Sequence, residues 1–126
     1  MNNKEYFKEY SRKYIAERRA NDSLFLLQDR VSNQVYRACK LNNITKSMSF
    51  WGTISYTLDE LKVHLEQQFW YGMSWNNYGE WHIDHIKPKS KFQIESYGDE
   101  QFMECWALDN LQPLWGEDNV LKGNNY

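Results

Sequence analysis

Two imidazoles and a carboxylate stand within four residues of this chain, in the segment Trp81-His82-Ile83-Asp84-His85-Ile86. A neutral imidazole can accept a proton from water, and a carboxylate is a hard ligand for a divalent cation. Two further polar blocks follow, Asn110-Leu111-Gln112-Pro113-Leu114-Trp115 and Asp118-Asn119-Val120-Leu121-Lys122-Gly123-Asn124. Because a hard cation, a neutral imidazole and a positioned phosphate suffice for phosphodiester hydrolysis, that is the chemistry we expect.

The three roles can be assigned to particular side chains. Asp84 and the carbonyl of Asn119 supply hard oxygen ligands, and His85 supplies the general base. Two protein ligands are enough for one Mg²⁺ or Mn²⁺ ion, since such ions usually keep several waters and take substrate phosphate oxygens. Zinc would favour additional His or Cys ligands, and of the three histidines His64 falls on a predicted helix, where we expect a structural role. We therefore expect no zinc.

Further side chains are expected to contact the phosphate backbone. His82 precedes Asp84 by two residues, so on a strand the two share a side, and His82 can touch the scissile phosphate or support the metal. Lys122 follows Asn119 by one helical turn and is expected at a flanking phosphate. The remaining candidates for contact with DNA are Lys87, Arg30 and Arg37.

The elements that must position these residues can be read from the sequence pattern. The histidines lie on a predicted strand that ends before Pro88, because proline cannot donate to a strand ladder. A long loop with a short helix over residues 99–106 follows, and then a second strand over 111–115. A closing helix over 117–122 stops at Gly123. Trp106 and Trp115 are expected to be core aromatics rather than base-stacking platforms.

Helices are predicted for the N-terminal half. Apolar residues at helical spacing indicate helices over residues 4–20 and 24–40, with residues 21–23 suited to end the first and cap the second. Residues 41–56 show no clear period, which predicts a connector. Thr57 and Glu60 form a capping-box pattern ahead of a third helix that is expected to reach about Trp70.

Residues 81–124 resemble the HNH nucleases of the His-Me finger superfamily, and residues 57–124 resemble its compact phage and homing-associated members. The resemblance implies that Asp84 is a metal ligand, His85 the general base and Asn119 the second metal ligand. It also implies that Asn110 braces the loop so that the base imidazole points at its water. The chain is then an HNN variant, which favours Mg²⁺ or Mn²⁺, and its products would carry 5′-phosphate and 3′-hydroxyl ends.

The resulting expectation is an α+β protein with a helical N-terminal half and a ββα-metal motif in the C-terminal half. Residues 1–50 are predicted to be a basic helical extension that contacts DNA, and residues 51–126 the nuclease domain. The net charge of −2 and the pI of about 5.9 argue against an ordinary nucleic-acid binder. However, residues 1–50 carry ten Lys and Arg against five Asp and Glu, whereas residues 51–126 carry five against twelve. This asymmetry suits a phosphate-gripping half and a cation-binding half, although solvated helix faces would produce it too.

The remaining sequence features bear on the location of the protein in the cell and on its partners. No apolar run approaches the length of a membrane span, no signal-peptide core opens the chain, and the isolated Cys39 and Cys105 indicate reduced packing residues. We expect an intracellular, cytoplasmic, phage- or mobile-element-encoded DNA nuclease, with no membrane partner. A homodimer and a phage-encoded partner protein both stay open. The alternatives are a catalytically silent DNA-binding module and a nuclease subunit that works only within a phage packaging or other assembly.

Overall fold

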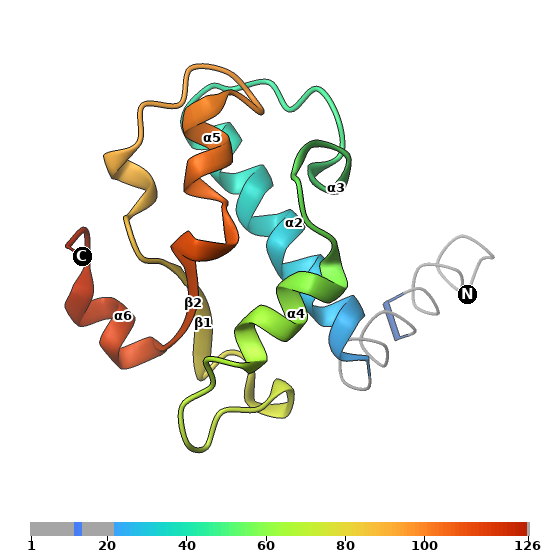
Figure 1. Cartoon of the computed structure of the whole chain (residues 1–126), viewed down its shortest axis with the longest axis vertical. Helices are drawn as coiled ribbons and strands as arrows, with labels where there is room; N and C mark the ends of the chain where they lie inside the picture. Colours follow the sequence, from blue (N-terminus) through green and yellow to red (C-terminus); the bar gives the residue numbers. More distant parts are fainter. Residues whose placement is uncertain (1–11, 14–21, 126) are drawn as a thin grey trace, which may run out of the picture.

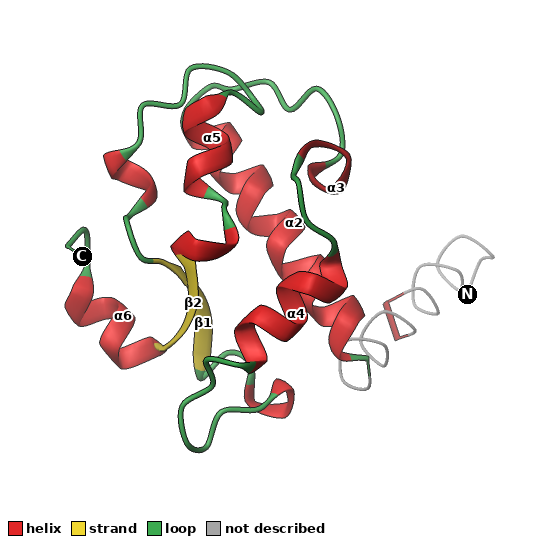
Figure 2. Ribbon diagram, in the orientation of Figure 1, coloured by secondary structure: helices red, strands yellow, loops and turns green. Residues whose placement is uncertain are grey.

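The computed structural model describes residues 12–13 and 22–125. It has the predicted α+β class, with helices around a two-stranded antiparallel sheet (Figures 1 and 2). The elements are α2 (Ser23–Leu41), α3 (Phe50–Thr53), α4 (Leu58–Glu66), η1 (Trp75–Asn77), β1 (Trp81–His85), η2 (Lys89–Lys91), α5 (Glu100–Cys105), η3 (Leu108–Asn110), β2 (Leu111–Trp115) and α6 (Gly116–Lys122). Apart from Arg12 and Lys13, which are helical, the helix predicted over residues 4–20 lies outside the described residues.

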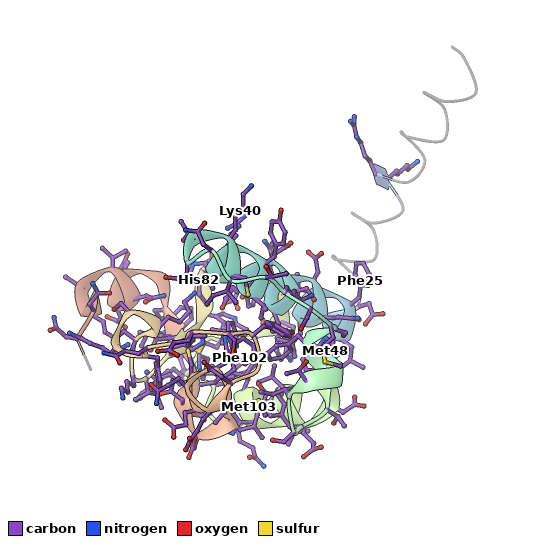
Figure 3. All side chains as sticks on the ribbon, turned by 90° about the horizontal axis from the view of Figure 1, so that it is seen from above. Phe25, Lys40, Met48, His82, Phe102 and Met103 are labelled. Carbon is purple, nitrogen blue, oxygen red and sulfur yellow. The ribbon has the colours of Figure 1, made fainter. Side chains whose placement is uncertain are left out.

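Helix α2 forms where the apolar period predicted it and extends one residue further at each end. Its first turn is capped by Asp22, whose Oδ1 accepts hydrogen bonds from the backbone N–H groups of Leu24 and Phe25, both at 3.1 Å. One apolar face is buried, formed by Leu26, Leu27, Val31, Val35 and Cys39. The opposite face is solvated, and Lys40 extends away from the body of the molecule in Figure 3.

The prediction of a connector over residues 41–56 is wrong in its second half. Phe50 begins the short helix α3, and Phe50, Ile54 and Tyr56 are all buried. The Phe50 ring meets those of Phe102 and Trp106 edge to face, and the Tyr56 hydroxyl donates to the Trp106 carbonyl at 2.6 Å. These partners are distant in sequence, so no local period could have signalled them.

Helix α4 starts as predicted but ends earlier. The reciprocal bonds of the capping box are present, since the N–H of Glu60 donates to Thr57 Oγ1 at 3.1 Å and the N–H of Thr57 donates to Glu60 Oε1 at 3.2 Å. The helix stops at Glu66, not at Trp70. The chain leaves the helix so that the Phe69 ring can pack against Trp75 and Trp81, with centroid distances of 5.5 and 5.0 Å.

The two strands pair antiparallel, with Asp84 opposite Gln112 and His85 opposite Leu111. Side-chain alternation directs Trp81 and Ile83 into the core, and it puts His82 and Asp84 together on the other face. Figure 1 shows the strands lying between α6 on one side and α4 and α2 on the other. Helix α6 ends at Gly123, whose φ of 54° is favourable for glycine, as the sequence predicted.

One apolar core runs through the described chain. It contains residues of α2 as well as Leu61 and Leu65 from α4, Trp81 and Ile83 from β1, and Trp106. Cys39 and Cys105 are buried free thiols in this core, as expected. Residues 22–50 and 51–125 thus pack around shared side chains. None of the described helices has the length and apolarity needed to cross a membrane.

Candidate active site

An open pocket of about 540 Å³ lies where β1, α6 and α2 meet. Its lining comes from α2 (Gln34, Arg37), β1 (His82, Ile83, Asp84, His85), the loop after β1 (Pro88, Lys89, Ser90) and the end of α6 (Asn119, Lys122, Gly123, Asn124). The pocket therefore brings together six of the residues singled out in the sequence: His82, Asp84, His85, Asn119, Lys122 and Arg37. The proposed metal ligands Asp84 and Asn119 line the same space, although they are 35 positions apart.

Among the described residues that line the pocket, Asp84 is the one carboxylate. Its side chain is 6% exposed and accepts a hydrogen bond from Gln112 Nε2, its cross-strand neighbour, at 2.8 Å on Oδ2. The ammonium of Lys122 lies 3.2 Å from both carboxylate oxygens. An ionised carboxylate offers about four lone-pair positions, so these two donors do not exhaust its capacity to bind.

Lys122 is engaged inside the protein. Besides its ion pair with Asp84, it donates to the backbone carbonyl of His85 at 2.7 Å, and its side chain is only 16% exposed. The sequence pattern placed this residue at a flanking phosphate. In this structure it holds the end of α6 against the end of β1, and it also lines the pocket.

His85 is buried, with 5% of its surface exposed, and its ring meets Trp106 edge to face at a centroid distance of 4.4 Å. Its Nε2 atom has no hydrogen-bond partner among the described residues, which is uncommon for a buried polar atom. Burial, followed by the charges of Lys89 and Lys122, lowers the pKa of His85 to about 3. The imidazole is therefore neutral at physiological pH.

Asn110 lies behind the pocket and ties down the chain that leaves β1. Its Oδ1 accepts from the backbone N–H of Lys87 at 2.8 Å, and its Nδ2 donates to the carbonyls of Lys87 and Cys105 at 3.2 and 2.9 Å. Its own carbonyl accepts from the N–H of Ile86 at 2.8 Å. These contacts are those of a brace. They fix the backbone immediately after His85, and they leave the amide no direct contact with the pocket lining.

The remaining predicted contacts are divided between the pocket and other surfaces. His82 lines the pocket beside Tyr78, whereas the guanidinium of Arg30 lies over the Tyr78 ring at 5.5 Å and lines no part of the pocket. Lys87 also lies elsewhere, with its Nζ over the Phe92 ring at 4.5 Å. His64 lies with Nε2 2.9 Å from the Leu111 carbonyl, which is the structural role expected of it.

Sequence reasoning missed three residues of this region: Gln112, Lys89 and Gln34. Gln112 could have been found, because it belongs to the Asn-Leu-Gln block and the register of two antiparallel strands puts it opposite Asp84. Lys89 carries no such signal, since three lysines occur within five residues and the sequence does not distinguish them. Gln34 comes from a helix whose docking angle depends on the whole core.

The oxygen donors suit a hard cation better than zinc. Within residues 12–13 and 22–125, no group of three His, Cys, Asp or Glu side chains gathers around one point. Asp84 and Asn119 both line the open pocket, and a carboxylate with one amide is a sparse set of hard ligands, which Mg²⁺ or Mn²⁺ can complete with water and phosphate oxygens. The residues present therefore fit such an ion.

Comparison with known proteins yields one relative among curated sequences. An uncharacterized protein of Acanthamoeba polyphaga mimivirus is 29% identical over 108 residues, which is 85% of this chain and 46% of the relative. The chain thus spans about half the length of the curated relative it matches. No family model matches the chain, and no solved structure matches it.

Proposed function

We propose that this protein is a divalent-metal-dependent DNA endonuclease of the HNH type. One observation carries the proposal: Asp84, His85 and Asn119, from two elements far apart in sequence, line one open pocket. The HNH resemblance of residues 81–124 assigns these same three residues its essential roles. The proposal requires more than an α+β fold, because β1, β2 and α6 must together form a ββα-metal motif.

In this proposal Asp84 and Asn119 hold one Mg²⁺ or Mn²⁺ ion. When bound, the ion supplies positive charge for the oxygens of the scissile phosphate and for the leaving group. Gln112 fixes the Asp84 carboxylate from the far side at 2.8 Å, so that the ligand is already oriented before the ion arrives. Lys122 must give up at least part of its contact with Asp84 when the ion binds.

His85 is the proposed proton acceptor. It takes a proton from the attacking water as the new oxygen–phosphorus bond forms, and the bond from phosphorus to the 3′ oxygen breaks. The 3′ oxygen is then protonated from solvent, which leaves 5′-phosphate and 3′-hydroxyl ends. Burial is the largest cause of the lowered pKa of His85, and the charges of Lys89 and Lys122 lower it further. A phosphate beside these two lysines would offset their part of the shift, and so make the ring a stronger base when substrate is present.

DNA is the proposed substrate, and strand nicking is the default outcome because a single site faces one strand at a time. Arg37 brings a guanidinium from α2 to the pocket, and the charge excess of residues 1–50 would add further phosphate contacts. An intracellular, phage- or mobile-element-encoded role is part of the same proposal. So is the possibility of a homodimer, which would allow cuts in both strands.

A plasmid-nicking assay tests the proposal. Supercoiled DNA incubated with the protein and Mg²⁺ or Mn²⁺ should become nicked, and EDTA should stop the reaction. His85→Ala should reduce nicking at least about 100-fold while leaving DNA affinity nearly unchanged. The matched control is His64→Gln, which alters an imidazole outside the pocket and should nick like the wild type.

Full nicking activity in His85→Ala would remove the proposed base. A wild-type protein that binds DNA without nicking it would favour the alternative of a silent DNA-binding module. Activity that emerges only when a second protein is added would favour a nuclease subunit of an assembly.

A further inference from the structure

Three cationic side chains line the pocket, namely Arg37, Lys89 and Lys122. They differ in the contacts that they already make inside the protein. Lys122 is held by Asp84 and by the His85 carbonyl. Among the described residues, the ammonium of Lys89 has no ion pair and no hydrogen bond, and it lies over the Trp106 ring. A phosphate that enters the pocket can therefore bind the ammonium of Lys89 without first breaking an ion pair, as it would have to at Lys122.

Lys89 and His85 both contact the ring of Trp106. The Trp106 ring receives the edge of His85 at a centroid distance of 4.4 Å and carries the ammonium of Lys89 over it, 6.0 Å from the centroid. Trp106 itself is 1% exposed and is fixed by Phe50 and by the bond from the Tyr56 hydroxyl to its carbonyl. Burial is the largest cause of the lowered pKa of His85, and the nearby charge of Lys89 adds to it.

The backbone that leads from His85 to Lys89 is held by hydrogen bonds. Asn110 clamps both the N–H and the C=O of Lys87, two residues earlier, and Pro88 restricts the next φ angle. The turn η2 then closes with a bond from the N–H of Lys91 to the Pro88 carbonyl at 2.9 Å. One brace therefore holds the backbone that connects His85 to Lys89.

The neighbouring lysines are arranged differently. Lys87 lies over Phe92, and Lys91 lines a separate surface hollow together with the acidic residues Glu95, Asp99 and Glu100. Of the three lysines in residues 87–91, Lys89 alone faces the pocket.

We propose that Lys89 is a further catalytic residue, which binds a non-bridging oxygen of the scissile phosphate beside His85 through its ammonium. Burial lowers the pKa of the Lys89 ammonium, and a bound phosphate would counter that shift by favouring the charged form. As a cation, Lys89 stabilises the negative charge that builds on that oxygen while water attacks. This inference rests on the proposed nuclease function and adds to it a cation supplied by the loop after β1 rather than by α6.

The test is the single-turnover cleavage rate at saturating DNA with Mg²⁺, for the wild type, Lys89→Met, Lys89→Arg and Lys91→Met. Lys89→Met should be slower by roughly 10- to 100-fold, Lys89→Arg should recover part of the rate, and Lys91→Met should match the wild type. Thermal unfolding of each variant shows that the loss is not one of folding.

A second measurement needs no cleavage. Once the cleaved bond is mapped on an oligonucleotide, that phosphate is replaced by a neutral methylphosphonate and DNA affinity is measured in EDTA. The wild type should lose affinity, and Lys89→Met should lose clearly less, because only Arg37 and Lys122 then face the phosphate as cations.

Equal rates in Lys89→Met and Lys91→Met, or equal sensitivity to the methylphosphonate, would overturn the role of Lys89 and leave the nuclease proposal intact. A wild-type protein that cleaves no DNA with either metal would overturn the nuclease proposal itself, and the role of Lys89 with it.

Discussion

At the scale of single residues, the Lys122 ammonium and the proposed divalent ion compete for Asp84 in our account. The carboxylate is nearly buried, one oxygen is held by Gln112, and both oxygens face the ammonium of Lys122. A buried ion pair is weak evidence for net stability, because desolvation offsets the attraction. Here the ammonium stands where positive charge is needed and, in our account, yields to a divalent ion.

Replacing Lys122 tests this competition. Lys122→Met should lower the free energy of unfolding by roughly 3 kcal/mol, since it leaves a buried carboxylate without its cation. It should also raise the affinity of the DNA-free protein for Mn²⁺ at least about tenfold, because no ammonium has to be displaced. Mn²⁺ binding followed by electron paramagnetic resonance measures the second effect.

The matched control is Lys89→Met, which removes the same charge from the same pocket without touching Asp84. If both variants changed Mn²⁺ affinity equally, the effect would be one of overall charge, and the competition at Asp84 would be disproved.

His85 gives a prediction about pH. Its folded-state pKa of about 3 lies below the unfolded value near 6.5, so the folded protein binds fewer protons between these values. Stability is therefore fully present above pH 6.5 and falls as the pH drops toward 3. From pH 7 to pH 5 the loss due to His85 should be about 2 kcal/mol.

Urea unfolding in EDTA at pH 7, 6 and 5 measures this loss. His85→Gln should lose less stability over the same interval than the wild type, because it removes the group that titrates. Parallel pH profiles for the two proteins would show that His85 is not held neutral by the fold.

At the scale of elements, the site depends on how the chain leaves β1. Asn110 spans this exit with bonds to Lys87 and Cys105, and it connects η3 to the loop that carries Lys89. The loop has few other backbone bonds of its own beyond the turn η2. The position of both the imidazole and the ammonium thus depends on one amide.

Asn110→Ala should therefore affect both stability and catalysis. It leaves the Lys87 N–H and the Cys105 carbonyl unpaired, which should lower the free energy of unfolding by about 2–4 kcal/mol. Nicking should fall more than DNA binding does, because the loop loosens around the reacting groups. The control is Asn76→Ala, an exposed asparagine in η1. Wild-type nicking in a folded Asn110→Ala protein would contradict the bracing role.

Local patterns explain which elements could be predicted. The strands, the helix α2, the short helix α5 and the closing helix α6 follow from periodicity and caps, and so does the pairing of Asp84 with His82 on one face. The end of α4, the helix α3 and the position of Lys89 could not be predicted. Each is decided by aromatic side chains that meet across the fold, such as Phe69 with Trp81 and Phe50 with Trp106.

At the scale of the whole molecule, helix α2 and the candidate site share one hydrophobic core. Leu27, Val31 and Val35 of α2 share a core with Leu61, Trp81 and Trp106. The same helix supplies Gln34 and Arg37 to the pocket. The packed helix α2 thereby brings one cation of the basic half, Arg37, to the site.

Leu27→Ala tests this unity. The side chain is fully buried, so the substitution should lower the free energy of unfolding by about 2–5 kcal/mol. Far-ultraviolet circular dichroism and tryptophan emission should report the same shifted transition, because helix and aromatic core unfold together. The matched control, Leu41→Ala, alters a leucine of α2 that is 83% exposed and should have little effect. Two separate transitions would show that α2 folds apart from the site.

The central claim is that Asp84 and Asn119 hold one divalent ion beside His85. A crystal soaked in Mn²⁺ tests it most directly, through anomalous scattering at the manganese edge. The account predicts one peak between the Asp84 carboxylate and the Asn119 amide oxygen, with the Lys122 ammonium displaced from Asp84. A soaked crystal with no peak there, or with manganese bound only by other side chains, would contradict it.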